Sequence, residues 1–253
     1  VAAMALFACE DLFLKWVSAA LPAGQMILLF GMVGGVMWSG LAWRAGARLF
    51  DRSLFHPMVM LRNFCEALGS MTFITALALI PLSTVAAILQ SAPLMVTMGA
   101  ALFLGERVGW RRWTAIVLGM IGVLMILRPG PDGLSFAAVI AVISVAALSA
   151  RDLVTRRIPQ EIHTLQLTTW AYLSMIPAGI VLMWLEGVGF EPITPSDGIG
   201  LAAAYALGAA GYYGVTHAMR IGEAAVVAPY RYTRLVFALA LAVYFLHERP
   251  DLW

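Results

Sequence analysis

The segment APYRYTR, residues 228–234, places two arginines and two tyrosines within about one helical turn, directly after Pro229. Proline removes a backbone hydrogen bond and opens a kink in a helix. Guanidinium groups bind anionic groups through paired hydrogen bonds and stack on flat rings. The pattern therefore predicts a binding site for an anionic or aromatic solute at Tyr230, Arg231, Tyr232 and Arg234. The alternative is that the two arginines extend to lipid head groups.

Three further couples of opposite charge are spaced four residues apart, so that each couple shares one face of a helix. They are Asp11 with Lys15, Arg62 with Glu66, and Asp152 with Arg156. Glu66 lies one turn deeper than Arg62 in its apolar segment, so we expect it to face the protein interior. The alternative is that each couple neutralises itself at the end of a membrane span.

Gln90 and Ser91, just before Pro93, interrupt another apolar segment. Gln90 is either a polar group of a solute pathway or part of an ordinary helix kink. Zinc-ligand spacing, a phosphate-binding loop, a nucleophile elbow and a Ser-His-Asp set are absent from the sequence. Cys9 and Cys65 define neither a disulfide framework nor a metal site. We therefore expect no catalytic residues, no metal and no cofactor.

The composition predicts a membrane protein. Of the 253 residues, 62% are hydrophobic and 12% are charged, whereas an ordinary soluble domain is about one quarter charged. Such a chain cannot cover a water-facing surface with polar groups. The net charge of +2 and the absence of a basic run argue against a nucleic-acid partner.

Apolar stretches of about 20 residues predict nine membrane-spanning helices joined by short loops. The expected spans are 1–18, 22–43, two within the uncharged run 67–105 that Pro81 divides, 113–127, 135–156, 162–185, 198–219 and 224–246. Arginines concentrate in the loops after the even-numbered spans, so the positive-inside rule predicts a cytoplasmic N-terminus. Most tryptophans fall near span ends, where they are expected to anchor the interface: Trp16, Trp38, Trp43, Trp110, Trp113, Trp184 and Trp253.

Residues 76–107 align without a gap on residues 218–249, and residues 8–15 align on 149–156. Glu106-Arg107 recurs as Glu248-Arg249, and Asp11 recurs as Asp152. Two repeats are predicted, 1–130 and 131–253. Because the first repeat has five spans, the second is expected to lie inverted in the bilayer, as in secondary transporters. The partner of the fifth span is missing, so we expect a clipped chain; the alternative is a natural nine-span protein.

Several glycines and polar residues have simpler expected roles. Gly31 and Gly35 form a GxxxG pattern, which is typical of helix packing. Glu248, in a loop, is expected to cap a helix, and His163, near a span end, is expected to be structural. By contrast, Glu10 and Arg151 occupy equivalent repeat positions with opposite charge. We predict that Glu10 and Arg151, next to Asp11 and Asp152, form a gate.

The two repeats resemble the EamA-type family of the drug/metabolite transporter superfamily. The resemblance lies in residues 92–130, APLMVTMGAALFLGERVGWRRWTAIVLGMIGVLMILRPG, and in their counterpart 228–253. It is closer to the bacterial branch with riboflavin and S-adenosylmethionine carriers. The resemblance implies ten helices, a central cavity, alternating access for small metabolites, and a peripheral tenth helix linked to homodimer contacts.

The sequence thus predicts an all-α polytopic helix bundle that moves a small polar metabolite across the bacterial inner membrane. One alternative is an intramembrane enzyme acting on lipid, which would need a nucleophile, a metal or an acid–base set at one depth. The other is a structural membrane subunit, which would not need paired charges inside its spans.

Overall fold

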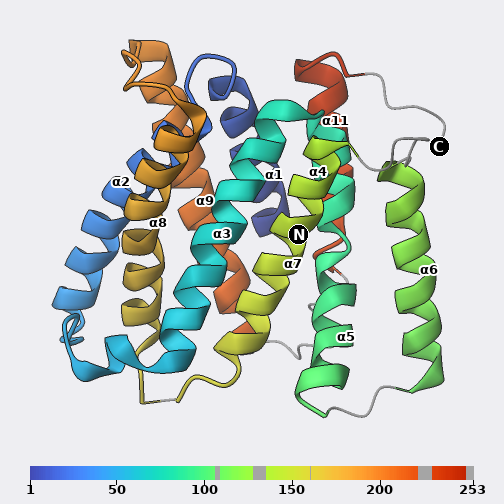
Figure 1. Ribbon diagram of the computed structural model, residues 1–253, viewed down its shortest axis with the longest axis horizontal. Coiled ribbons are helices and arrows are strands. Elements are labelled where there is room, and N and C mark those ends of the chain that lie inside the picture. Colours follow the sequence, from blue (N-terminus) through green and yellow to red (C-terminus); the bar gives the residue numbers. More distant parts are fainter. Residues whose placement is uncertain (106–108, 128–134, 160, 222–229, 249–253) are drawn as a thin grey trace.

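A computed structural model describes residues 1–105, 109–127, 135–159, 161–221 and 230–248, and only the backbone of residues 213 and 215–221. Every regular element in these ranges is helical (Figure 1). The α-helices are α1 (Ala2–Val17), α2 (Ala23–Arg44), α3 (Pro57–Leu79), α4 (Leu82–Leu89), α5 (Ala92–Phe103), α6 (Trp110–Leu127), α7 (Phe136–Thr155), α8 (Thr164–Glu186), α9 (Pro195–Ile221) and α11 (Thr233–Phe245), and a 3₁₀ helix, η1, covers Arg52–Phe55. The predicted all-α class is confirmed.

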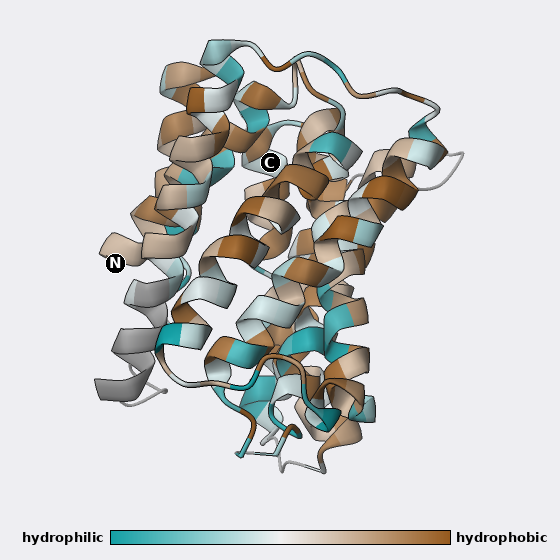
Figure 2. Cartoon of the chain, turned by 90° about the vertical axis from the view of Figure 1, so that its left-hand side faces the viewer, coloured by the Kyte–Doolittle hydropathy of each residue, from teal (hydrophilic) through white to brown (hydrophobic). Residues whose placement is uncertain are grey.

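Within the described ranges, five segments are long and apolar enough to cross a membrane. These are α2, the combined segment Leu82–Phe103, α6, α7 and α8. Figure 2 shows hydrophobic residues along the helices and hydrophilic residues gathered toward the ends of the bundle. Large aromatic side chains such as Trp43 and Trp184 are each 79% exposed on the outside. A water-soluble protein would bury such surface, so the exterior matches a lipid environment.

Proline sets several helix boundaries. Pro81 separates α3 from α4 and lies at the N-cap of α4, and Pro22 lies at the N-cap of α2. Gln90 and Ser91 separate α4 from α5, with Pro93 in the first turn of α5. The predicted polar break in this span is confirmed. The third span begins earlier than the uncharged run suggested, because α3 starts at Pro57 and carries its charged residues inside the helix.

The strongest helix contact joins α2 to α8, and the next two join α3 to α7 and α1 to α9. Glycines let α2 and α8 approach closely. A Cβ atom on Gly31 would lie 2.9 Å from the backbone nitrogen of Ile176, and one on Gly179 would lie 2.5 Å from that of Leu28. Gly35 contacts Leu173 in the same interface. The predicted packing role of the GxxxG pattern is confirmed.

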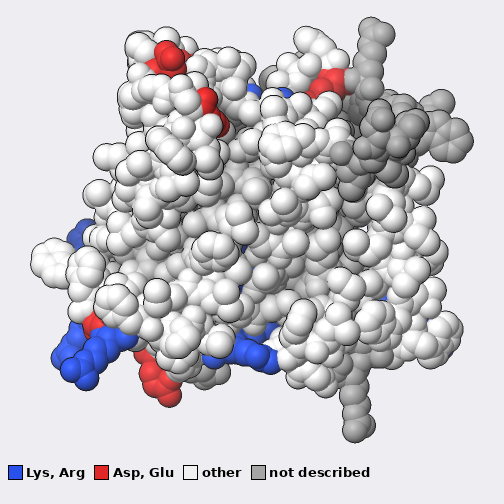
Figure 3. Space-filling model, in the orientation of Figure 1, with Lys and Arg blue, Asp and Glu red and all other residues white. Residues whose placement is uncertain are grey.

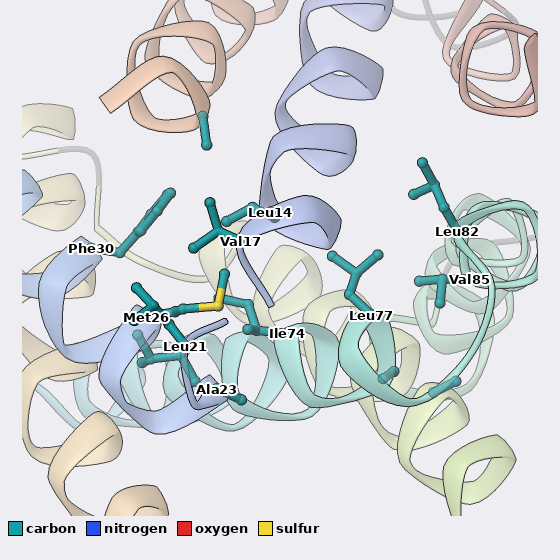
Figure 4. Close-up of a cluster of buried hydrophobic side chains, with 14 of the residues drawn as sticks. Leu14, Val17, Leu21, Ala23, Met26, Phe30, Ile74, Leu77, Leu82 and Val85 are labelled. Carbon is teal, nitrogen blue, oxygen red and sulfur yellow. The ribbon is translucent and has the colours of Figure 1, made fainter. Parts of the chain in front are cut away.

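One large hydrophobic cluster closes the upper end of the bundle as drawn in Figure 1 (Figure 4). It joins the end of α1, the start of α2, the end of α3 and the start of α4. Labelled members in Figure 4 include Leu14, Val17, Met26, Leu77 and Leu82. The corresponding cluster at the lower end, around Val59 and Trp170, is smaller. The upper end is therefore the more tightly packed one.

Carboxylates and a histidine cap helices at the bundle ends. Glu248 accepts hydrogen bonds from the backbone N–H groups of Leu82 and Ser83 at 2.7 and 3.0 Å, and so caps α4. His163 caps α8 through its Nδ1, which accepts from the N–H of Leu165. Both structural roles predicted from the sequence are confirmed. Asp51 caps η1, and its hydrogen bonds from Ser53 hold the pKa of its carboxyl below the ordinary value.

Candidate functional site in the centre of the bundle

An ion pair joins α1 to α11. The carboxylate of Asp11 accepts from Nη2 of Arg234 at 2.7 Å to each oxygen and from Nε at 3.0 Å. Asp11 is 1% exposed, whereas the side chain of Arg234 is 24% exposed. The guanidinium group also lies 5.1 Å from the ring centre of Phe7. Two-point pairing of this kind fixes both groups in orientation.

A second ion-pair group joins α3 to α7. Arg151 donates to the two carboxylate oxygens of Glu66 at 3.0 and 3.2 Å, and to Asp152 at 2.7 Å. Arg62 lies 3.8 Å from Glu66 and donates to Thr155 Oγ1 and to the carbonyl of Leu167. The i,i+4 couple predicted for α3 therefore forms, and Glu66 is buried as expected.

These side chains are not sealed from solvent. Arg151 is 26% exposed and Asp152 32% exposed, although the helices that carry them pack against the rest of the bundle. Charged groups within a membrane protein face one another or water rather than lipid. The two ion-pair groups therefore face one another and the other helices of the bundle rather than lipid.

The sequence misplaced several partners. Asp11 pairs with Arg234 on another helix rather than with Lys15, which donates to the carbonyls of Leu77 and Ile80. The predicted Glu10–Arg151 pair does not form in this structure, because Arg151 binds Glu66 and Asp152. Helical spacing finds neighbours on one helix, but contacts between helices depend on how each helix is rotated.

The APYRYTR segment is only partly brought into the centre. Arg234 is there, but Asp11 already binds its guanidinium group. Tyr230, Arg231 and Tyr232 are exposed, and Pro229 lies outside the described residues. Gln90 is partly buried at the α4–α5 break. Arg231 and Arg234 therefore lie in different surroundings in this structure, and the predicted solute site at this segment stays a prediction.

Sequence reasoning missed an aromatic cluster beside the ion pairs. Trp38 on α2 stacks on Tyr172 of α8 with ring centres 6.4 Å apart, and meets Tyr212 of α9 edge-on at 6.1 Å. Tyr205 meets Tyr172 edge-on at 6.0 Å. Trp38 is therefore an interior residue rather than the interfacial anchor we predicted. The spacing of Tyr205 and Tyr212, seven residues apart on α9, was the available signal.

The two ends of the bundle differ in charge. Figure 3 shows most lysine and arginine side chains of this face at the lower end, together with some acidic ones, whereas the upper end carries mainly acidic side chains. The chain positions agree: Arg44 ends α2 and Arg156 follows α7 at the lower end, whereas Glu186 ends α8 at the upper end.

The bundle is all-helical, its exterior suits lipid, and its interior holds ion pairs. These features define a polytopic membrane protein. A family model described as the EamA-like transporter family matches residues 1–128 and 135–253. The chain belongs to this family, and it is a membrane transporter.

Three curated proteins illustrate the similarity. The riboflavin transporter of Rhizobium johnstonii is 32% identical over 171 residues, which cover 67% of this chain and 55% of that protein. The pseudopaline exporter of Pseudomonas aeruginosa is 27% identical over 246 residues, 97% of this chain and 85% of that protein. The S-adenosylmethionine uptake transporter of Rickettsia felis is 26% identical over 200 residues, 76% of this chain and 64% of that protein.

Proposed function

We propose that the chain is a secondary transporter that carries a small polar metabolite across the bacterial inner membrane by alternating access. The two moving units are the inverted repeats 1–130 and 131–253, with the N-terminus in the cytoplasm. The positive end of the bundle then faces the cytoplasm. The metabolites named for the relatives, riboflavin, S-adenosylmethionine and pseudopaline, are the first candidates for transport.

The packing of the helices supports two equivalent halves. The repeat matches α1 with α7, α2 with α8, and α3 with α9. If each helix is replaced by its repeat partner, the α1–α9 contact becomes the α7–α3 contact, and the α2–α8 contact becomes α8–α2, which is the same contact. All three contacts are present in the structure. Inverted halves related in this way place the solute site at their interface.

The observation that carries the proposal is that both interior ion-pair groups connect one half to the other. Arg234 of the second half binds Asp11 of the first, and Arg151 of the second half binds Glu66 of the first. We propose that rocking of the halves weakens these pairs on one side and re-forms them on the other. Because the larger hydrophobic cluster lies at the acidic end, we propose that the solute enters from the positive end in this state.

The test measures uptake and efflux of riboflavin, S-adenosylmethionine and pseudopaline in membrane vesicles that contain the full chain. We expect movement of at least one of them above vesicles without the protein. Arg234→Ala should reduce that movement strongly, whereas Arg44→Ala, which removes an exposed arginine at a helix end, should not. Arg231→Ala should lower transport if Arg231 contacts the solute, and should leave transport unchanged if Arg231 contacts only lipid head groups.

Two outcomes would contradict the proposal. If a broad metabolite panel shows no movement in either direction, the chain is not a transporter of small polar metabolites. If Arg234→Ala and Arg151→Gln both transport at the rate of the unaltered protein, the ion pairs do not belong to the transport cycle.

A further inference from the structure

Glu10 lies near the middle of α1, and its carboxylate faces α9. A Cβ atom on Gly208 would lie 2.3 Å from Oε1 of Glu10, so the glycine makes room for this carboxylate. Within the described ranges, Glu10 forms neither an ion pair nor a hydrogen bond. Arg234 lies close enough to act on it electrostatically, but its guanidinium group is held by Asp11. Glu10 is only partly buried.

In the other repeat, the contact that corresponds to Glu10 and Gly208 is an ion pair. Position 10 corresponds to 151 and position 66 corresponds to 208. Arg151 meets Glu66 in one half, and Glu10 meets Gly208 in the other. The two contacts are therefore equivalent, but the second one lacks the ion of opposite charge.

Among the described side chains, the ion-pair groups and Glu10 hold one more carboxylate than guanidinium groups. The ion-pair groups and Glu10 together contain four carboxylates and three guanidinium groups: Glu10, Asp11, Glu66 and Asp152 against Arg62, Arg151 and Arg234. The three arginines bind the other three carboxylates or backbone groups. A carboxylate in the interior of a membrane protein needs a counter-charge or a proton, since an isolated charge is unfavourable there. Among the described side chains, Glu10 is thus the carboxylate of this group that no cation binds.

The helix face that meets this carboxylate also carries two tyrosines of the aromatic cluster. Gly208 lies three residues after Tyr205 and four before Tyr212 on α9, so the three share one face. Tyr205 meets Tyr172, and Tyr212 meets Trp38. Trp38 is only 9% exposed, and within the described part of the chain its indole N–H has no partner at hydrogen-bond geometry. A buried donor without a partner is uncommon, and ligands frequently satisfy such groups.

We infer that Glu10, Trp38 and Tyr172 form the recognition site for the positively charged group of the solute, so that the transported molecule is an organic cation. Aromatic faces attract organic cations, most strongly where water is excluded, and the carboxylate supplies the counter-charge. The Trp38 N–H binds an acceptor elsewhere on the same solute. This inference rests on the proposed transport function and narrows its substrate class.

The test uses two pairs of probes that differ in charge but little in shape: 1-methylnicotinamide against nicotinamide, and choline against 3,3-dimethylbutanol. Binding of each to the purified full chain is measured in detergent, and uptake is measured in proteoliposomes. The unaltered protein should bind the cation of at least one pair at least about tenfold more tightly than its neutral counterpart. Glu10→Gln should abolish this preference while leaving the weak binding of the neutral probe unchanged.

Matched variants separate recognition from folding. Glu161→Gln removes the same charge from an exposed position and should change nothing. Gly208→Ala places its methyl group against the flexible end of Glu10, so it should reduce the cation preference without a large loss of thermal stability. Trp38→Phe keeps a ring but removes the N–H, and should weaken both members of the 1-methylnicotinamide pair alike.

Three results would overturn the inference. The first is equal binding of cation and neutral probe in both pairs, or no binding of either at 10 mM. The second is an unchanged cation preference in Glu10→Gln. The third is a Glu10→Gln protein that keeps its solute selectivity but loses the pH dependence of transport, which would assign a proton to Glu10. If the vesicle panel shows transport of an anionic or neutral metabolite, the transport function stands and only the cation site fails.

Discussion

The ion pair between Asp11 and Arg234 allows a quantitative prediction. Asp11→Asn keeps the size of the side chain but removes the charge that three contacts of 2.7–3.0 Å hold. Breaking a buried pair by removing one partner costs about 3–5 kcal/mol, because the other charge is left without compensation. Arg234 is 24% exposed, so water relieves part of this cost, and we expect a loss of about 2–3 kcal/mol.

For a chain of this length, 1 kcal/mol corresponds to roughly 2–4 °C in the unfolding midpoint. We therefore expect Asp11→Asn to lower the midpoint by about 5–10 °C in detergent, measured by labelling of the buried Cys65 during heating. Asp51→Asn, an exposed carboxylate at the cap of η1, is the matched control and should shift the midpoint little, because asparagine also caps helices.

A double-mutant cycle tests the pairing itself. With Arg234→Gln in place, Asp11→Asn should cost much less than it does alone, since no unpaired charge remains. The reasoning is refuted if Asp11→Asn is no more harmful than Asp51→Asn, or if the effects of Asp11→Asn and Arg234→Gln add within about 0.5 kcal/mol.

Three further predictions follow from other contacts. Glu248→Ala removes the cap of α4 and should cost about 1 kcal/mol, seen as a fall of a few degrees in the unfolding midpoint; an unchanged midpoint would show that the cap is replaceable. Gly179→Ala forces a methyl group against the backbone of α2 and should cost about 1–3 kcal/mol, whereas Gly122→Ala, with nothing within 4 Å of its new Cβ, should be neutral or stabilising in the same assay. Glu66→Gln should reduce vesicle transport by about tenfold or more, and adding Arg62→Gln should recover part of it, because Arg151 keeps Asp152 whereas Arg62 is left without a carboxylate; a double variant worse than both single variants would contradict the pairing.

Much of the fold could be predicted because lipid imposes simple rules. Spans must be apolar and about 20 residues long, so their number and order follow from hydrophobic runs and proline breaks. The break at Gln90, the glycine contact at Gly31 and the cap at Glu248 could be predicted because each follows from residue types that lie close together in the sequence. The start of α3 was less accurate, because Arg62 and Glu66 lie inside a helix where a rule based on uncharged runs does not expect them.

The sequence by itself determined that this is a membrane-embedded helix bundle and that charged residues such as Glu66 lie inside its apolar segments, because the runs around them are apolar and long enough to cross lipid. Only the tertiary structure decided which groups meet. Asp11 turned out to face Arg234, more than two hundred residues away along the chain, and Trp38 turned inward to Tyr172. The physical reason is that helical periodicity fixes neighbours within one helix, whereas the rotation and crossing of packed helices fix neighbours between them.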